Sequence, residues 1–199
     1  MTAIITGDII NSRKGEVKTW LPILKEVLNQ YGQSPSNWEI FRGDSFQLSI
    51  APKYAVLVAF HIKSAIKQTA AQDVRMGIGI GKIKYSSNKI TESNGSAYIR
   101  SGECFESLKK QTLAIKSNNY ELDISLNIML NLALLSADNW SRTVSTVIKK
   151  TIENSNTKQK GIANLLNKSQ SSISEALKRG GFEEIMSLNN YYKNQITKL

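Results

Sequence analysis

Cysteine and histidine are almost absent from this sequence of 199 residues, which holds one of each, Cys104 and His61. A single cysteine excludes an intramolecular disulfide and is typical of a reducing compartment, so we expect a cytoplasmic protein. No zinc site is recognisable, nor is a catalytic pairing of histidine with serine or cysteine. We therefore interpret His61 as a structural or surface residue of a helix, and Cys104 as a small packed residue.

Long hydrophobic runs are missing as well. No apolar segment approaches the roughly 18 residues that cross a membrane. Met1 is not followed by the basic and apolar regions of a signal peptide. We expect no membrane partner and no cleaved leader. Proline is also scarce: Pro22, Pro35 and Pro52 all lie in the first third of the sequence, so later helices are unobstructed.

Acidic residues are too few to balance the basic ones, and the net charge is +10. The excess is uneven along the chain. Residues 140–199 hold ten Lys and Arg against four Asp and Glu, a net +6, whereas residues 1–139 hold sixteen against twelve, a net +4. A basic segment of this kind attracts nucleic-acid phosphates, although small lysine-rich domains are often simply soluble.

Hydrophobic periodicity predicts an α+β fold for the first 110 residues. We expect strands at residues 3–6, 38–42, 46–50 and 74–84, and helices at 16–31, 54–71 and 96–110. Pro22 should kink the first helix or mark its start. The order strand, helix, strand, strand, helix, strand predicts a ferredoxin-like arrangement of split βαβ units. Glycines 77, 79 and 81 alternate within a strand and are expected to admit another backbone closely.

Two aspartates are brought together by that topology. Asp8 follows the first strand, and Asp44 precedes the third, which is its antiparallel neighbour. Paired carboxylates suit Mg²⁺ or Mn²⁺ holding a phosphate ligand. Ser12, Arg13 and Arg42 lie close by in sequence and are the predicted nucleotide-binding residues. Glycine–aspartate pairs are also ordinary turn residues, so a turn-only role for both carboxylates is the alternative.

Four segments resemble the catalytic domain of class III nucleotidyl cyclases and, more distantly, GGDEF and polymerase-palm domains. They are residues 6–9 (TGDI), 41–46 (FRGDSF), 75–81 (RMGIGIG) and 95–103 (GSAYIRSGE), in the order of that family. The resemblance implies that Asp8 and Asp44 bind a metal. In cyclases the fourth segment also supplies an Asn and, four residues later, an Arg. By register these positions are Ile99 and Glu103 here, and Arg100 lies one residue off, so we expect a sensor that binds a nucleotide without cyclising it.

After residue 122 the pattern is helical. Residues 122–135 are strongly apolar and are expected to form a helix buried on most sides, although their alternation would also suit a strand. Helices are further predicted at residues 140–152, 158–166 and 170–178. The residues expected to face inward are Ile162, Ala163 and Leu166, followed by Ile173 and Leu177. Asn167 should adopt a left-handed turn conformation, and Ser169 should cap the last of these helices.

The segment 158–181 resembles the helix-turn-helix of many bacterial regulators. Its outward face would offer hydrogen-bonding and cationic side chains to the DNA major groove. The predicted DNA-binding residues are Ser169, Gln170, Ser171, Ser174, Lys178 and Arg179. The alternative is a helical hairpin that packs against the rest of the protein and does not touch DNA.

The whole chain resembles the SatD-like family of bacteria. We expect three parts: a cyclase-like ferredoxin-fold domain at residues 1–120, an apolar connecting helix at 121–139, and an all-α helix-turn-helix domain at 140–199. The first hypothesis is a homodimeric DNA-binding transcriptional regulator that senses a nucleotide with Mg²⁺. The second is a divergent nucleotidyl cyclase or nucleotidyltransferase using Asp8 and Asp44. The third is an interaction protein in which the cyclase-like fold is only a scaffold.

Overall fold

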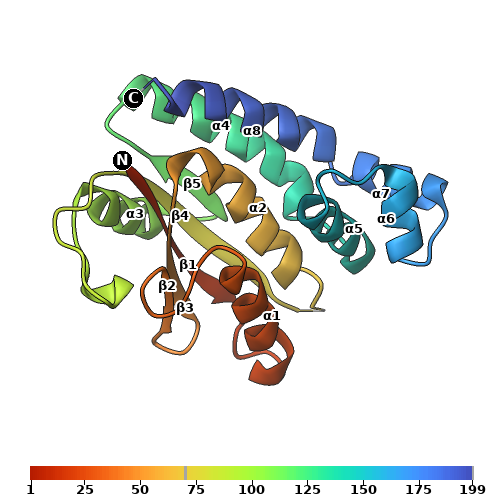
Figure 1. The fold of residues 1–199 in the computed structure, drawn as a ribbon, viewed down its shortest axis with the longest axis horizontal. Coiled ribbons are helices and arrows are strands. Elements are labelled where there is room, and N and C mark those ends of the chain that lie inside the picture. The colour runs from red at the N-terminus through yellow and green to blue at the C-terminus, as the bar shows by residue number, and fades with distance from the viewer. Residues whose placement is uncertain (70, 199) are drawn as a thin grey trace.

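The computed structural model describes residues 1–69 and 71–198 and is an α+β structure (Figure 1). Its strands form one mixed sheet: β1 (Thr2–Ile10), β2 (Trp38–Phe41), β3 (Ser45–Ile50), β4 (Asp73–Gly81) and β5 (Leu113–Lys116). The helices are α1 (Val17–Asn29), α2 (Ala55–Ile66), α3 (Ser96–Ser107), α4 (Tyr120–Ala137), α5 (Arg142–Glu153), α6 (Gln159–Leu165), α7 (Gln170–Arg179) and α8 (Phe182–Ile196), with short 3₁₀ turns η1 (Pro52–Tyr54) and η2 (Ile90–Glu92). None of these helices is long and apolar enough to cross a membrane.

The strands are arranged in the order β2-β3-β1-β4-β5. The first four pair antiparallel, and β5 adds to β4 in parallel. The predicted antiparallel pairing of the first and third strands is confirmed. Since β1 extends to Ile10, Asp8 lies inside the strand rather than after it, opposite Ser45. The sequence reading missed β5, because a strand of only four residues carries little periodic signal.

Several predicted boundaries were too generous. Helix α2 ends at Ile66 instead of residue 71, and α3 ends at Ser107 instead of residue 110. Pro22 lies inside α1, so it does not mark the start of that helix. Ala70, in the predicted second helix, and Leu199, at the end of the predicted third part, lie outside the described residues.

The two faces of the sheet are packed differently. Alternate residues of β1, β3 and β4, including Ile5, Leu48 and Ile78, join the buried core that α1 and α2 cover. On the opposite face, Gly77, Gly79 and Gly81 lie directly under α3. A Cβ added at any of the three would clash with backbone atoms of α3. The expected close approach of another backbone is therefore confirmed.

Helix α4 resolves the ambiguous apolar segment as a helix. Leu126, Leu130 and Leu134 are buried, as the helical period requires. The expectation that this helix is buried on most sides was wrong, because α4 packs on one side only, against β5 and α8. Its outer side is exposed to solvent, with Leu135 at 72%. Figure 1 shows α8 running along α4 at the edge of the molecule.

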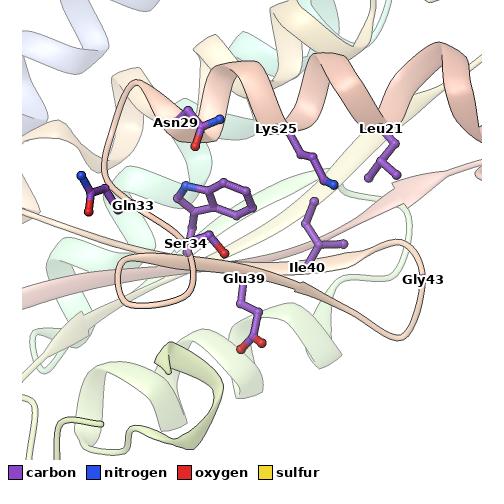
Figure 2. Close-up of a pocket in the computed structure, with 9 residues that line it drawn as sticks. Leu21, Lys25, Asn29, Gln33, Ser34, Glu39, Ile40 and Gly43 are labelled. Atoms are coloured by element: carbon purple, nitrogen blue, oxygen red, sulfur yellow. The ribbon is translucent and has the colours of Figure 1, made fainter. Parts of the chain in front are cut away.

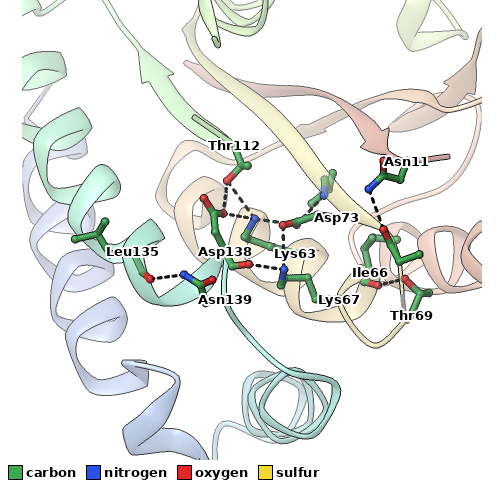
Figure 3. Close-up of polar contacts among 12 residues, drawn as sticks. Asn11, Lys63, Ile66, Lys67, Thr69, Asp73, Thr112, Leu135, Asp138 and Asn139 are labelled. Carbon is green, nitrogen blue, oxygen red and sulfur yellow. Dashed lines mark hydrogen bonds and ion pairs between the residues drawn. The ribbon is translucent and has the colours of Figure 1, made fainter. Parts of the chain in front are cut away.

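A fully buried lysine joins the sheet to the end of α4. Lys63 of α2 lies 2.8 Å from Asp73 Oδ1, 2.7 Å from Asp138 Oδ1 and 3.1 Å from Thr112 Oγ1 (Figure 3). The Thr112 hydroxyl in turn donates to Asp138, and Lys67 bridges Asp73 and the Asp138 carbonyl. Charges in a dry interior are tolerated only when they are paired in this way.

A second polar cluster joins α1, α2 and α5. The imidazole of His61 lies 2.5 Å from the Tyr31 hydroxyl at Nδ1 and 3.5 Å from Glu153 at Nε2, and Lys149 contacts both Glu153 and Glu26. Burial lowers the pKa of His61 to about 4, although the nearby Glu153 carboxylate acts in the opposite direction. His61 is therefore a packed, neutral residue at neutral pH, consistent with the structural interpretation.

We predict that Lys63→Met lowers the free energy of unfolding by about 3 kcal/mol, because it leaves two carboxylates without their buried partner. Urea denaturation monitored by circular dichroism measures this change. The matched control is Lys18→Met on the exposed side of α1, which should leave the transition unchanged. Equal midpoints for the two variants would contradict a stabilising role of the Lys63 network.

We also predict an acid-sensitive stability set by His61. Its folded pKa is about 4, below the ordinary value of 6.5, so its contribution is fully present above pH 6.5 and is lost as pH falls toward 4. Between pH 7 and pH 4.5 the unfolding free energy should drop by roughly 2–3 kcal/mol through this group. The His61→Gln variant should lack that part of the pH dependence. Parallel stability profiles of the variant and the wild type would disprove the assignment.

Candidate functional site

The two predicted metal ligands lie side by side at one end of β1. Asp8 belongs to β1, and Asp44 closes the three-residue turn that joins β2 to β3. The Ile9 amide donates to the Asp44 carbonyl at 3.2 Å, which fixes the turn against β1. The register of β1 with β3 thus brings both carboxylates to the same corner of the sheet, as the topology predicted.

The turn and the β1–α1 loop hold unusual backbone conformations. Arg42 and Gly43 have φ of +53° and +93°, and Asn11 in the loop has φ of +59°. From this loop the Ser12 hydroxyl donates to Asp44 Oδ2 at 2.5 Å. Ser12 is therefore part of the carboxylate corner. Arg13 and Arg42 flank it in sequence, and both side chains are exposed to solvent.

Arg75 is the residue of this corner that sequence reasoning missed. It stands opposite Asp8 in the β1–β4 pair and binds that carboxylate in a bidentate manner, with Nε–Oδ1 at 3.0 Å and Nη2–Oδ2 at 2.5 Å. Its guanidinium also lies 5.5 Å from the ring centre of Phe105. The hydrogen bond and charge of Asp8, together with the charge of Asp44, raise the pKa of Arg75. Only the register of β1 with β4 could have revealed this pair.

The oxygen atoms gathered at this corner suit a hard cation, although one of the carboxylates already has a partner. Asp8, Asp44 and Ser12 offer oxygen atoms, which Mg²⁺ prefers. The Asp8 carboxylate is already paired with Arg75, so a cation that binds there would compete with the guanidinium. Within residues 1–69 and 71–198 no cluster of three or more acidic, histidine or cysteine side chains is positioned to hold a metal.

Helix α3 turns its cyclase-related positions away from this corner. Ile99 is 61% exposed, and Glu103 forms a surface ion pair with Lys116 at 2.9 Å. The guanidinium of Arg100 donates to the Ile80 carbonyl at 2.7 Å, toward the far end of β4. Phe105, near the end of α3, is the residue of this helix that contacts the Asp8–Arg75 pair.

A groove of about 740 Å³ opens between α1 and the edge strand β2 (Figure 2). Trp38 and Ile40 line it. Lys25 reaches toward it from α1 in Figure 2. Gly43 forms one end of the groove, next in sequence to Asp44. This groove therefore adjoins the carboxylate corner.

A second candidate region is formed by α6, α7 and the turn between them. Ile162 and Ala163 of α6 and Ile173 of α7 are buried, as predicted, and the structure adds that both helices pack against α5. Asn167 has φ of +50°, and the Ser169 hydroxyl accepts from the Ser172 amide at 3.2 Å, so both local predictions are confirmed. These turn and cap residues set the direction in which α7 leaves α6.

The other side of α7 faces solvent. All six residues predicted to contact DNA are exposed: Ser169, Gln170, Ser171, Ser174, Lys178 and Arg179. The end of α7 is held from behind by α4 and the segment after it. Ser136 Oγ donates to the Arg179 carbonyl at 3.2 Å, and Trp140 Nε1 donates to the Gly180 carbonyl at 2.9 Å. This anchoring of α7 by α4 was not predicted from the sequence.

Comparison with known proteins gives one family. The SatD family model matches residues 2–196, almost the whole chain, so the protein belongs to the SatD family. None of the curated proteins with which the chain was compared matches it.

Proposed function

We propose that this SatD-family protein is a DNA-binding transcriptional regulator whose α6 and α7 form a helix-turn-helix. The observation that carries the proposal is the division of α7 into two faces. Ile173, Ala176 and Leu177 are buried, whereas the opposite face is exposed and carries the predicted polar and cationic DNA contacts together with one acidic residue, Glu175.

Charge supports the same proposal. Residues 140–199 carry a net +6. Lys178 and Arg179 lie in the last turn of α7, where cations also complement the helix dipole. Binding to phosphates releases counterions and gives an affinity that falls with salt. The amide and hydroxyl groups of Gln170, Ser171 and Ser174 would then distinguish bases.

The N-terminal part is proposed to be a cyclase-like sensor of a nucleotide with Mg²⁺. Its first four strands follow the order of a ferredoxin-like fold, and Asp8, Asp44 and Ser12 meet at one corner. A bound Mg²⁺ would supply positive charge for phosphate oxygens. Displacement of Arg75 from Asp8 would free a guanidinium beside those phosphates, so ligand binding would rearrange the corner.

A second candidate function is a divergent nucleotidyl cyclase or nucleotidyltransferase. The juxtaposition of Asp8 and Asp44 favours it, whereas Ile99 and Glu103 stand in place of the Asn and Arg that would stabilise a transition state, and both lie at the surface. Formation of product from labelled ATP or GTP, lost in Asp44→Asn, would decide for this enzyme.

The regulator is further proposed to act as a homodimer, since helix-turn-helix proteins commonly read paired half-sites.

We predict that Lys178→Gln/Arg179→Gln weakens binding to random-sequence duplex DNA by about tenfold or more. Two lost phosphate contacts should also reduce the slope of log affinity against log salt by about two. Fluorescence anisotropy at several salt concentrations measures both quantities. Lys82→Gln/Lys84→Gln removes the same charge from the segment after β4, far from α7 in Figure 1, and should change neither. Identical salt slopes for all three proteins would refute the assignment of α7.

For the carboxylate corner we predict competition between Arg75 and divalent cations. Arg75→Gln should bind Mn²⁺ at least about tenfold more tightly than the wild type, because Asp8 is no longer neutralised. Asp8→Asn/Asp44→Asn should abolish binding. Isothermal titration calorimetry with Mn²⁺ alone measures this, and Arg100→Gln, which removes an arginine from the far end of β4, is the control.

The same titrations with ATP and GTP in the presence of Mg²⁺ test the sensor. Binding that disappears in Asp8→Asn/Asp44→Asn supports it. If Mn²⁺ binds none of the proteins and neither nucleotide binds the wild type, the sensor proposal fails while the DNA-binding proposal stands on its own data.

A further inference from the structure

An apolar stripe runs along the outer side of α4. Five large side chains recur there every three or four residues and are therefore on one helical face. They are Tyr120, Ile124, Ile128, Leu132 and Leu135, with exposed fractions from 39% to 75%. Single exposed apolar residues are ordinary on a protein surface, but a continuous row of this kind marks an association site.

The same stretch of helix is free of charge. Residues 124–137 contain no Asp, Glu, Lys or Arg, in a protein in which 21% of residues are charged. The exposed positions in this stretch therefore lack the charges that keep a helix surface solvated. Depletion of charge together with exposed large apolar side chains is the composition of the centre of a protein–protein interface.

Two grooves of about 450 and 290 Å³ lie beside the stripe and share Gln111 and Asn131. The first includes Ile124 and Ile128, and the second includes Leu135. Together they follow α4 from its N-terminal to its C-terminal end. A helix laid along the stripe would find a continuous depression for its side chains.

The charges at the two ends of the stripe are complementary. Glu121 is exposed in the first turn of α4. Lys110 lines the groove that Leu135 forms at the other end, where the one carboxylate of the groove, Asp138, is already paired with Lys63. An antiparallel pair of α4 helices centred on Ile128 would place Glu121 opposite Leu135 of the partner subunit. Each acidic end would then meet the partner's Lys110, and the two helix dipoles would oppose each other favourably.

We propose that the occupant of this surface is α4 of a second copy of the chain, in a twofold antiparallel arrangement. The five side chains present on the order of 500 Å² of apolar surface per protomer, a large part of the about 800 Å² that each partner contributes to a standard interface. A surface that is apolar at its centre and oppositely charged at its ends is self-complementary under a twofold axis. This inference rests on the homodimer of the proposed function and names its interface.

Pairing through α4 would also set the spacing of the two α7 helices. Ser136 and Trp140, at and just beyond the end of α4, hold the carbonyl groups at the end of α7. The α7 helices would therefore be fixed relative to the interface rather than carried on a free linker. A dimer of this geometry reads two half-sites at one defined separation.

The experiment measures the mass of the full chain in solution, without DNA, by sedimentation equilibrium. The wild type should weigh twice the chain mass of 22.2 kDa at micromolar concentration. Ile128→Glu should weaken the dimer by about 100-fold or more, because the substitution occurs twice in a symmetric interface. Ile99→Glu, the same change on the exposed side of α3, is the matched control and should remain dimeric.

Charge exchange tests the antiparallel register. Glu121→Lys and Lys110→Glu should each weaken the dimer, and the double variant Glu121→Lys/Lys110→Glu should restore it. These variants lie on the surface, so loss of folding does not confuse the result, and circular dichroism checks this for Ile128→Glu. Dimerisation without rescue in the double variant would overturn the antiparallel arrangement.

A monomeric wild type, or an Ile128→Glu variant as dimeric as the wild type, would overturn the proposal. Vesicles of phosphatidylcholine and phosphatidylserine test the other apolar occupant: a monomer that binds them through Ile128 makes α4 a lipid-binding surface instead. Because mass is measured without DNA, a stable dimer that fails to bind DNA rejects the proposed function and keeps this interface.

Discussion

The buried ammonium of Lys63 is the interaction on which the arrangement of the whole chain depends. Asp73 begins β4, and Asp138 ends α4, so the two carboxylates that Lys63 binds belong to the sheet and to the C-terminal helices. Hydrophobic packing is tolerant of small displacements, whereas the fully buried Lys63 ammonium needs both carboxylates within ion-pair distance. The network therefore fixes where α4 stops and where the chain turns into α5.

The Lys63 network lies on the path of the chain between the carboxylate corner and α7. Arg75 lies two residues after Asp73 on β4, so one strand carries both the partner of Asp8 and an anchor of α4. From α4, Ser136 and the following Trp140 reach the end of α7. A change in which Arg75 leaves Asp8 begins close to the elements that position α7. Such contiguity is the physical requirement for coupling, and the measured coupling between ligand and DNA affinity would establish it.

Local chemistry explains which features could be predicted from the sequence. The α+β class, the close approach of another backbone to the glycines of β4, and the Asn167 and Ser169 turn follow from short-range rules, and the β1–β3 pairing follows from strand order. The juxtaposition of Asp8 and Asp44 needed only strand order. The roles of Lys63 and Arg75 could not be predicted, because their partners are distant in sequence and depend on register and on three-dimensional packing.

Helix α4 is less buried than its composition predicts. Its leucines and isoleucines are numerous enough to suggest burial on most sides, yet the protein covers one side only. Composition cannot distinguish a helix that is buried within its own chain from one that is covered only by a second chain, since charged residues are depleted in both. Only the exposed fractions of Ile128, Leu132 and Leu135 separate the two cases. An apolar helix that its own fold leaves half uncovered, and whose end holds the proposed DNA-reading helix, is where association and DNA spacing would be decided together.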